Sequence, residues 1–449
     1  MSPTQRFAFV TILLLLAGLQ AHPTAAAEPA PAAAAKAPPN IVLIISDDHA
    51  WTDYSFMGHE QIRTPNLDRL AEQSLVFPHG YVPSSLCCPS LASIVTGLYP
   101  HQHKITSNDP PLPAGMSRKD FLATPAFRDG REIMNRHLEA VPTLPRLFAD
   151  AGYESLQTGK WWQGDFHRGG FTHGMTHGGR HGDDGLEIGR KTMQPIYDFI
   201  ANERRNKHPF FVWYAPMMPH QPHNPPQRLL KKYEAVAPTL AVAKYWGMVE
   251  WFDETVGGLL THLDNEGLTD NTIVVYVADN GWITNPQTGA FAPRSKQSQY
   301  DGGLRTPIMI RWPGHAKPGR SESLASSLDL APTLLAAANL KPTPQMPGIN
   351  LLDDKAVADR KAIFGECFTH HSKDLDQPAA SLRWRWMISR EHDDNWKLIV
   401  PDSSNEPESA VELYNLADDP FEERNLADKE SGRVESMRSK INAWWAAGK

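Results

Sequence analysis

Two acidic pairs directly follow two apolar, β-branched segments of the chain. Asp47 and Asp48 end the stretch IVLIISDD, and Asp279 and Asn280 end the stretch TIVVYVADN. The carboxyl ends of parallel strands form the ligand crevice of open α/β sheets, so the two pairs are predicted to meet there. Three carboxylates and one amide oxygen suit a hard cation, Ca²⁺ or Mg²⁺. The competing interpretation is that Asp and Asn merely begin turns after strands.

A second chemical candidate is the pair of adjacent cysteines in SSLCCPSLASIVTG, residues 84–97. Pro89 suits the first turn of a helix and Gly97 suits its end. Cys87 is then expected at the helix N-terminus, where backbone N–H groups and the helix dipole favour an anion and lower the pKa of a thiol. A nucleophile for an anionic substrate fits this place, although a buried structural cysteine is the more common case. Physical reasoning alone does not choose between Cys87 and Cys88.

These side chains need a sheet to bring them together, and the chain has the pattern of one. Short β-branched segments alternate with helix-like segments, and the candidate strands are 41–45, 153–157, 209–214, 273–277 and 307–311. Apolar residues from Met248 to Leu263 recur at helical spacing, and Gly267 closes that segment. The alternation predicts an α/β fold with a large, mostly parallel sheet that helices cover on both faces.

The pattern changes after about residue 347. Four strand-like segments follow one another without helices between them, at 362–369, 381–389, 396–400 and 411–416. An amphipathic helix over about 430–445 comes last. We therefore predict a catalytic domain over 39–345 and, over 346–449, a small α+β domain with an antiparallel sheet and one helix.

The N-terminus has the pattern of a secretory signal. A short positive start precedes the apolar segment 7–19 and small residues up to Ala27. A membrane span needs about 20 apolar residues, so a signal peptide over 1–27 is predicted rather than an uncleaved anchor. The Ala/Pro-rich segment 28–38 is typical of a linker. The mature protein is therefore expected to be exported, to the periplasm or beyond the cell, and to have no membrane span.

Charge and cysteine content exclude two further classes. The formal net charge is -7, and no long Lys/Arg run is present that would follow a phosphate backbone, so nucleic acid is not an expected partner. The chain has three cysteines, of which the third is Cys367. An odd count does not make a disulfide framework, and a bridge between adjacent Cys87 and Cys88 would be strained.

The cysteine stretch also carries a family resemblance. The motif Cys-x-Pro-Ser starting at Cys87, with Thr-Gly at 96–97, resembles the maturation signature of type I sulfatases, the formylglycine-dependent, arylsulfatase-like branch of the alkaline phosphatase superfamily. In that family the first cysteine is oxidised to formylglycine, which implies Cys87 and puts Cys88 at a variable position. Further stretches resemble the family's blocks in the family's order: PNIVLIISDDHAWTD, RTPNLDRLAEQS, QTGKWW, YAPMMPHQPHNPP, VADNGW, SKQSQYDGGLRTPIMIRWPG and ELYNLADDPFEERNLA.

Carried over position by position, the resemblance implies a metal site and a sulfate site in an alkaline-phosphatase-like fold. The implied Ca²⁺ ligands are Asp47, Asp48, Asp279, Asn280 and the modified Cys87. The residues implied to bind the sulfate group and assist proton transfer are Lys160, His220 and Lys296. The resemblance further implies a sulfated small molecule or glycan as substrate, and a formylglycine-generating or sulfatase-maturating enzyme as partner.

The chemistry of a sulfate ester agrees with this set. Its anionic oxygens repel a nucleophile, and a cation with two ammonium groups offsets that repulsion. An aldehyde hydrate supplies an oxygen nucleophile, and Lys296 or His220 would protonate the leaving alcohol. Each assignment has an alternative. Lys160 and Lys296 could be ordinary solvated lysines. His220 and His223 could form a rigid turn or part of a zinc site.

Two positions depart from the family pattern. Leu91 stands where the family has an Arg, and Trp162 stands where it has a His. Leu donates no hydrogen bond and indole accepts no proton, so neither change is conservative. One interpretation is a variant active site in which another base takes over, with candidates His101, His103 and His49. The others are a non-catalytic protein that binds sulfated glycans, and a phosphonate or phosphodiester hydrolase of the same superfamily.

One Gly- and His-rich stretch, RGGFTHGMTHGGRHGDDG at 168–185, is expected to be a long loop. Its polar side chains are candidates for contact with sugar hydroxyls: His173, His177, His181, Asp183 and Asp184. A loop that packs on the rim with incidental histidines explains the composition as well.

Overall fold

The computed structural model of the chain describes residues 37–391 and 394–447. The predicted signal peptide over 1–27 and nearly all of the predicted linker lie outside these residues. Within them, no helix combines the length and the apolar character that crossing a membrane requires.

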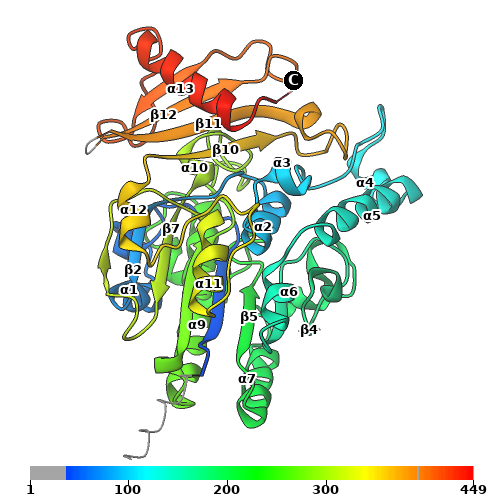
Figure 1. The fold of residues 1–449 in the computed structure, drawn as a ribbon, viewed down its shortest axis with the longest axis vertical. Coiled ribbons are helices and arrows are strands. Elements are labelled where there is room, and N and C mark those ends of the chain that lie inside the picture. The colour runs from blue at the N-terminus through cyan, green and yellow to red at the C-terminus, as the bar shows by residue number, and fades with distance from the viewer. Residues whose placement is uncertain (1–36, 392–393, 448–449) are drawn as a thin grey trace, which may run out of the picture. The chain divides into compact units, whose positions relative to one another are not determined.

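The main element is a nine-stranded sheet of mixed, mostly parallel strands, as predicted (Figure 1). Its strands are β1 (Asn40–Ser46), β2 (Leu75–Tyr81), β3 (Glu154–Gly159), β4 (His173–Gly174), β5 (Phe210–Ala215), β6 (Thr272–Ala278), β7 (Arg305–Arg311), β8 (Gly319–Arg320) and β9 (Ala325–Ser326). Their order is β4-β3-β5-β1-β6-β7-β2-β8, and β9 also pairs with β2. All pairs from β4 to β6 are parallel, whereas β7 runs antiparallel to both of its neighbours.

Helices cover both faces of this sheet. The α-helices described up to residue 359 are α1 (Pro65–Glu72), α2 (Cys87–Thr96), α3 (Pro100–His103), α4 (Arg118–Phe121), α5 (Pro125–Glu139), α6 (Leu144–Ala149), α7 (Gln194–Asn206), α8 (Gln227–Glu234), α9 (Leu240–Asn265), α10 (Asp301–Leu304), α11 (Leu330–Ala337) and α12 (Asp354–Asp359). Alternate residues of β1 face opposite cores, because successive side chains of a strand point to opposite faces. Ile41, Leu43 and Ile45 pack with α2, α6 and α11, while Val42 and Ile44 pack with α1, α7 and α9.

The second sheet is small and antiparallel, also as predicted. It contains β10 (Ala362–Phe368), β11 (Leu382–Glu391), β12 (Asp394–Pro401) and β13 (Glu412–Asn415) in sequence order. Helix α13 (Ser431–Trp444) packs on it through Met437 and Ile441, and Figure 1 shows this helix in red beside the orange strands. Residues 38–449 form one compact unit, so the domain boundary near 345 stays a prediction.

Four adjacent parallel strands, β3, β5, β1 and β6, end at the same edge of the large sheet. The segments that leave these ends are therefore brought side by side, although they are distant in the sequence. This edge holds the candidate site.

Candidate active site

The two acidic pairs meet where β1 and β6 end. Asp47, Asp48, Asp279 and Asn280 are all buried there. The Asp48 N–H donates to Oδ1 of Asp279 at 3.1 Å, and the Tyr245 hydroxyl donates to the Asp48 carbonyl at 3.3 Å. Asp48 has a φ of 62°, in the left-handed region that residues other than glycine rarely adopt. These contacts hold an uncommon backbone conformation that turns the chain at the sheet edge.

Two lysines pair with the first two carboxylates. The Nζ atom of Lys160 lies 2.7 and 2.6 Å from the two carboxylate oxygens of Asp47, and that of Lys296 lies 2.6 and 2.7 Å from those of Asp48. Lys160 owes its place to the glycine before it. A Cβ atom at Gly159 would lie 1.9 Å from the Ala215 carbonyl oxygen, so only glycine fits there. Neither lysine is an ordinary solvated one, because both are buried.

The charges of this cluster do not balance. Three carboxylates face two ammonium groups, which leaves one excess negative charge when all five are ionised. Burial would raise the pKa of Asp48, but Lys296, His220 and Lys160 outweigh burial and lower it to about 2. Lys160 lies 4.0 Å from Asp279, but burial and the charge of Asp47 outweigh it and raise the pKa of the Asp279 carboxyl well above the ordinary range.

The donor set therefore fits a divalent cation. Among the described residues, Oδ2 of Asp279 is buried without a hydrogen-bond partner. Ligand atoms of Asp47, Asp48, Cys87 and His220 lie within 4.8 Å of one another. Carboxylate oxygens of this kind are the ligands that hard cations prefer, and a cation would offset the excess negative charge.

The two adjacent cysteines have separate surroundings at the start of α2. The Cys87 Sγ atom lies 3.2 Å from Oδ1 of Asn280 and 4.0 Å from Oδ1 of Asp47. The Cys88 Sγ atom instead accepts a hydrogen bond from Nε2 of Gln163 at 3.1 Å, away from the carboxylates. Cys87, Cys88 and Cys367 are all free cysteines without a disulfide bond.

The expectation that the helix N-terminus lowers the pKa of the Cys87 thiol is wrong for this structure. Burial raises the pKa of this thiol, and the charges of Lys160 and Lys296 do not compensate for it. Asp279 and Asp48 raise it further. A thiol in this place stays protonated.

His220 reaches the cluster from the segment after β5. Its Nε2 atom lies 3.5 Å from Oδ2 of Asp48, and its Nδ1 atom lies 2.6 Å from the Gln221 carbonyl oxygen. A carbonyl only accepts, so Nδ1 carries a proton. Burial and the charge of Lys160 lower the pKa of His220 to about 4. His223 does not belong to the cluster of possible metal ligands that contains His220. It packs against Tyr245 and Trp282 instead.

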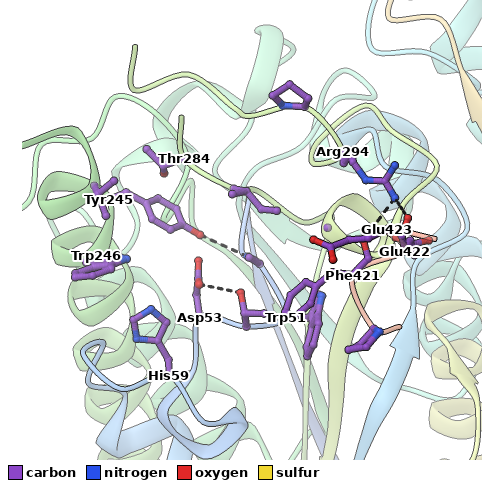
Figure 2. Close-up of a pocket in the computed structure, with 17 residues that line it drawn as sticks. Trp51, Asp53, His59, Tyr245, Trp246, Thr284, Arg294, Phe421, Glu422 and Glu423 are labelled. Atoms are coloured by element: carbon purple, nitrogen blue, oxygen red, sulfur yellow. Dashed lines mark hydrogen bonds between the residues drawn. The ribbon is translucent and has the colours of Figure 1, made fainter. Parts of the chain in front are cut away.

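A pocket of about 670 Å³ opens onto this cluster. Its lining includes Cys87, His220 and Lys296, with Trp162, Arg180 and His181 on its wall. A second cavity, of about 500 Å³, lies between the segment after Asp48 and Phe421 (Figure 2). That cavity contains aromatic and acidic side chains but neither Cys87 nor the two lysines, so we place the chemistry in the first pocket.

None of the three proposed substitute bases lines the pocket that holds Cys87. His49 contacts the Asp53 carbonyl, His101 contacts Glu366 and His103 contacts Ser93. Leu91 is buried in the core.

The stretch 168–185, expected to be a long loop, contains β4 and supplies two of the pocket's residues, Arg180 and His181. The sequence predicts His181 only as a contact for sugar hydroxyls and does not single out Arg180. The Gly- and His-rich composition of the loop was the one signal that pointed to them, since Asp109, which binds Arg180, is distant in the sequence.

Comparisons with known proteins match most of this chain to one family. The family model described as "Sulfatase" matches residues 39–340, and the model "N-sulphoglucosamine sulphohydrolase, C-terminal" matches residues 289–444. N-acetylgalactosamine-6-sulfatase of Homo sapiens is 30% identical over 438 residues, 86% of this chain and 79% of that protein. Arylsulfatase A of Homo sapiens is 30% identical over 70% of this chain and 67% of that protein.

A solved structure described as BT4656 in complex with its substrate D-glucosamine-2-N,6-O-disulfate has the same fold. Its TM-score to this chain is 0.70 at 20% sequence identity, over 92% of this chain and 99% of that chain.

Proposed function

The chain belongs to the sulfatase family, and from this premise we propose that it releases sulfate from a sulfated carbohydrate, with a formylglycine formed from Cys87 and a bound Ca²⁺ ion. Members of the family are sulfuric ester hydrolases, so hydrolysis of a sulfate ester is the reaction class. The observation that carries the finer proposal is that Cys87, two lysines and three carboxylates form one cluster, and that Cys87 and Lys296 of this cluster line a pocket.

We assign the cation to Asp47, Asp48, Asp279 and Asn280. A divalent ion would change the formal charge of the lysine–carboxylate cluster from one negative to one positive, which favours an anionic ester. When bound, the ion stabilises the negative charge on the sulfate oxygens. Mg²⁺ suits the same oxygen ligands, and a titration of both metals distinguishes them.

Cys87 needs modification to act in this scheme. Its pKa is raised, so the thiol itself is a poor nucleophile at neutral pH. An aldehyde at this position supplies a hydroxyl nucleophile through its hydrate. A maturating enzyme is therefore a required partner, and it would act on a chain exported by the predicted signal over 1–27.

Lys160, Lys296 and His220 have different parts in the proposed reaction. The two lysines stay charged, because the carboxylates of Asp47 and Asp48 outweigh burial and raise the pKa of each. They would hold the sulfate oxygens as fixed positive charges. His220 lies beside Asp48 with Nε2 unprotonated, so in this scheme Nε2 takes up a proton from solvent and passes it to the leaving alcohol.

The size and lining of the pocket support a sugar substrate. A volume of about 670 Å³ is within the usual range for small-molecule sites. Trp282 and Phe291 offer apolar faces, and Arg118 and His370 offer polar groups around them. Two relatives with sugar substrates, an N-acetylgalactosamine-6-sulfatase and the protein with the disulfated glucosamine, support the same class.

The test is sulfate release by purified, Ca²⁺-loaded protein from its native host. The panel contains 4-nitrophenyl sulfate, 6-sulfated N-acetylgalactosamine and glucosamine, and the matched phosphate esters. We expect turnover of the sulfated sugars and none by the Cys87→Ala variant. Faster hydrolysis of the phosphate esters would make the chain a phosphoester hydrolase, and binding of sulfated sugars without turnover would make it a binding protein.

A further inference from the structure

A short network of hydrogen bonds ends at His181 in the pocket wall. The buried carboxylate of Asp109 accepts from Nε and Nη2 of Arg180, each at 2.9 Å. The remaining group, Nη1, lies 2.6 Å from Nε2 of His181. A guanidinium donates hydrogen bonds and never accepts them. Nε2 of His181 is therefore an acceptor, and the proton of the neutral ring lies on Nδ1.

The surroundings keep this ring neutral. Burial lowers the pKa of His181, and the positive charges of Lys160 and Arg180 lower it further. Within the part of the chain that the structure describes, no hydrogen-bond partner of Nδ1 is found. His181 thus offers one N–H donor to whatever enters the pocket.

Packing and backbone both fix His181 in this place. Its ring lies edge-on to Trp162 with centroids 4.4 Å apart, and the Arg180 guanidinium lies 4.7 Å from the Trp162 ring centroid. His181 has a φ of 76°, and its carbonyl accepts the Trp161 N–H at 2.9 Å. Conformations of this kind are strained and persist where the surrounding structure enforces them.

We propose that His181 binds the substrate by donating its Nδ1–H to a sulfate oxygen, and that Asp109 and Arg180 are positioning residues that set its tautomer. The substrate in this inference is the sulfate ester of the proposed function, on which it rests. Trp162 holds the imidazole and the guanidinium by packing and makes no contact of its own with sulfate in this scheme.

The tautomer is measurable without any turnover. The protein is labelled with ¹⁵N in its histidine rings, and the His181 signals are identified by their loss in His181→Asn. We expect the nitrogen shifts of a neutral ring protonated at Nδ1 at pH 7. A ring protonated at Nε2, or at both nitrogens, would overturn the inference. In Arg180→Lys a second population protonated at Nε2 should appear, because Lys cannot make the same forked contact.

Sulfate binding by the Ca²⁺-loaded protein tests the donor. His181→Ala should weaken the affinity for inorganic sulfate roughly tenfold or more, since a hydrogen bond to a charged group is lost. His181→Asn keeps an N–H donor and should therefore recover most of the lost affinity for sulfate. If His181 acted as a general base, Asn could not replace it. His177→Ala, an exposed residue of the same loop, is the matched control and should bind sulfate as the wild type does.

The two proposals fail in different ways. If no sulfate ester is turned over but His181→Ala weakens sulfate binding, the proposed function fails and this inference holds. If sulfate esters are hydrolysed and His181→Ala binds sulfate as the wild type does, the inference fails and the function holds.

Discussion

The sulfur of Cys87 lies 3.2 Å from the side-chain oxygen of Asn280, although 193 residues separate the two. Cys87 begins α2, and Asn280 follows β6 at the edge where the parallel strands end. The contact exists only when the central sheet is complete. The reactive position and the proposed cation site are therefore built by the same folding event.

Cation binding should stabilise the fold, because it relieves the excess negative charge among Asp47, Asp48 and Asp279. At 100 times Kd, Ca²⁺ should add about 2.7 kcal/mol to the free energy of unfolding, and a chelator should remove that gain. Differential scanning calorimetry with and without Ca²⁺ measures this effect as a shift of Tm. The Asp279→Asn variant should show little of this shift. A wild-type Tm that changes neither with Ca²⁺ nor with chelator would contradict the metal assignment.

Lys160 should matter for the rate and not only for packing. Lys160→Gln removes a fixed positive charge beside the sulfate, and the loss of one such group costs on the order of 10²- to 10³-fold in kcat. The control is Lys191→Gln, because Lys191 is exposed and pairs with Glu187 four residues before it. Sulfatase assays on both variants decide the point: a Lys160→Gln enzyme as active as the control would remove Lys160 from the mechanism.

A buried ion cluster should join the two sheets. Lys397 of β12 lies 2.8 Å from Asp301 and 2.7 Å from Glu422, and all three side chains are buried. Lys397→Met removes the ammonium group between two buried carboxylates, which should lower the free energy of unfolding by about 3–5 kcal/mol. Urea unfolding measures it, and Lys355→Met, at an exposed lysine, should change it by less than about 0.5 kcal/mol. Equal effects of the two variants would argue against a structural role for the cluster.

Acid should destabilise the protein through buried neutral histidines, of which His103 is an example. Its Nδ1 accepts the Ile105 N–H and its Nε2 contacts the Ser93 hydroxyl, each at 3.1 Å. Burial lowers the pKa of His103 from 6.5 to about 3. Between these values the unfolded state binds a proton that the folded state does not. The contribution of neutral His103 to the free energy of unfolding therefore has its full value above pH 6.5. It decreases as the pH falls toward 3.

The size of this effect is up to about 1.4 kcal/mol for each pH unit below 6.5. Urea unfolding of the wild type and of His103→Gln at pH 7, 6 and 5 measures it. The variant should lose less stability on acidification. The same slope for both proteins would show that His103 is not the titrating group.

The strands that carry the site were predictable from their composition. β1, β5 and β6 are continuous apolar, β-branched or aromatic segments, as fully buried parallel strands are. Polar residues follow directly after β1 and β6. β2 was not predicted, because its sequence LVFPHGY contains Pro78 and Gly80, which weaken the pattern of a strand. Strand β7 was predicted as a segment. Its antiparallel direction depends on its pairing partners, β2 and β6, and could not be predicted from its own residues.

The parts of the site that the sequence did not predict are those set by distant contacts. The bidentate pair of Asp109 and Arg180 joins two loops, and neither loop has a pattern that specifies the other. The raised pKa of Cys87 likewise depends on burial and on the charges of Asp279 and Asp48, which are distant in the sequence, whereas a position at a helix start suggests the opposite direction.

Mass spectrometry of the tryptic peptide 70–104 tests the central claim most directly. The protein should be expressed in its native host with the N-terminal segment intact, so that maturation can occur before analysis. We predict an aldehyde in place of the thiol at Cys87 and an unmodified thiol at Cys88. An intact thiol at Cys87 in every preparation would contradict the proposed mechanism, because the pocket would then lack its nucleophile.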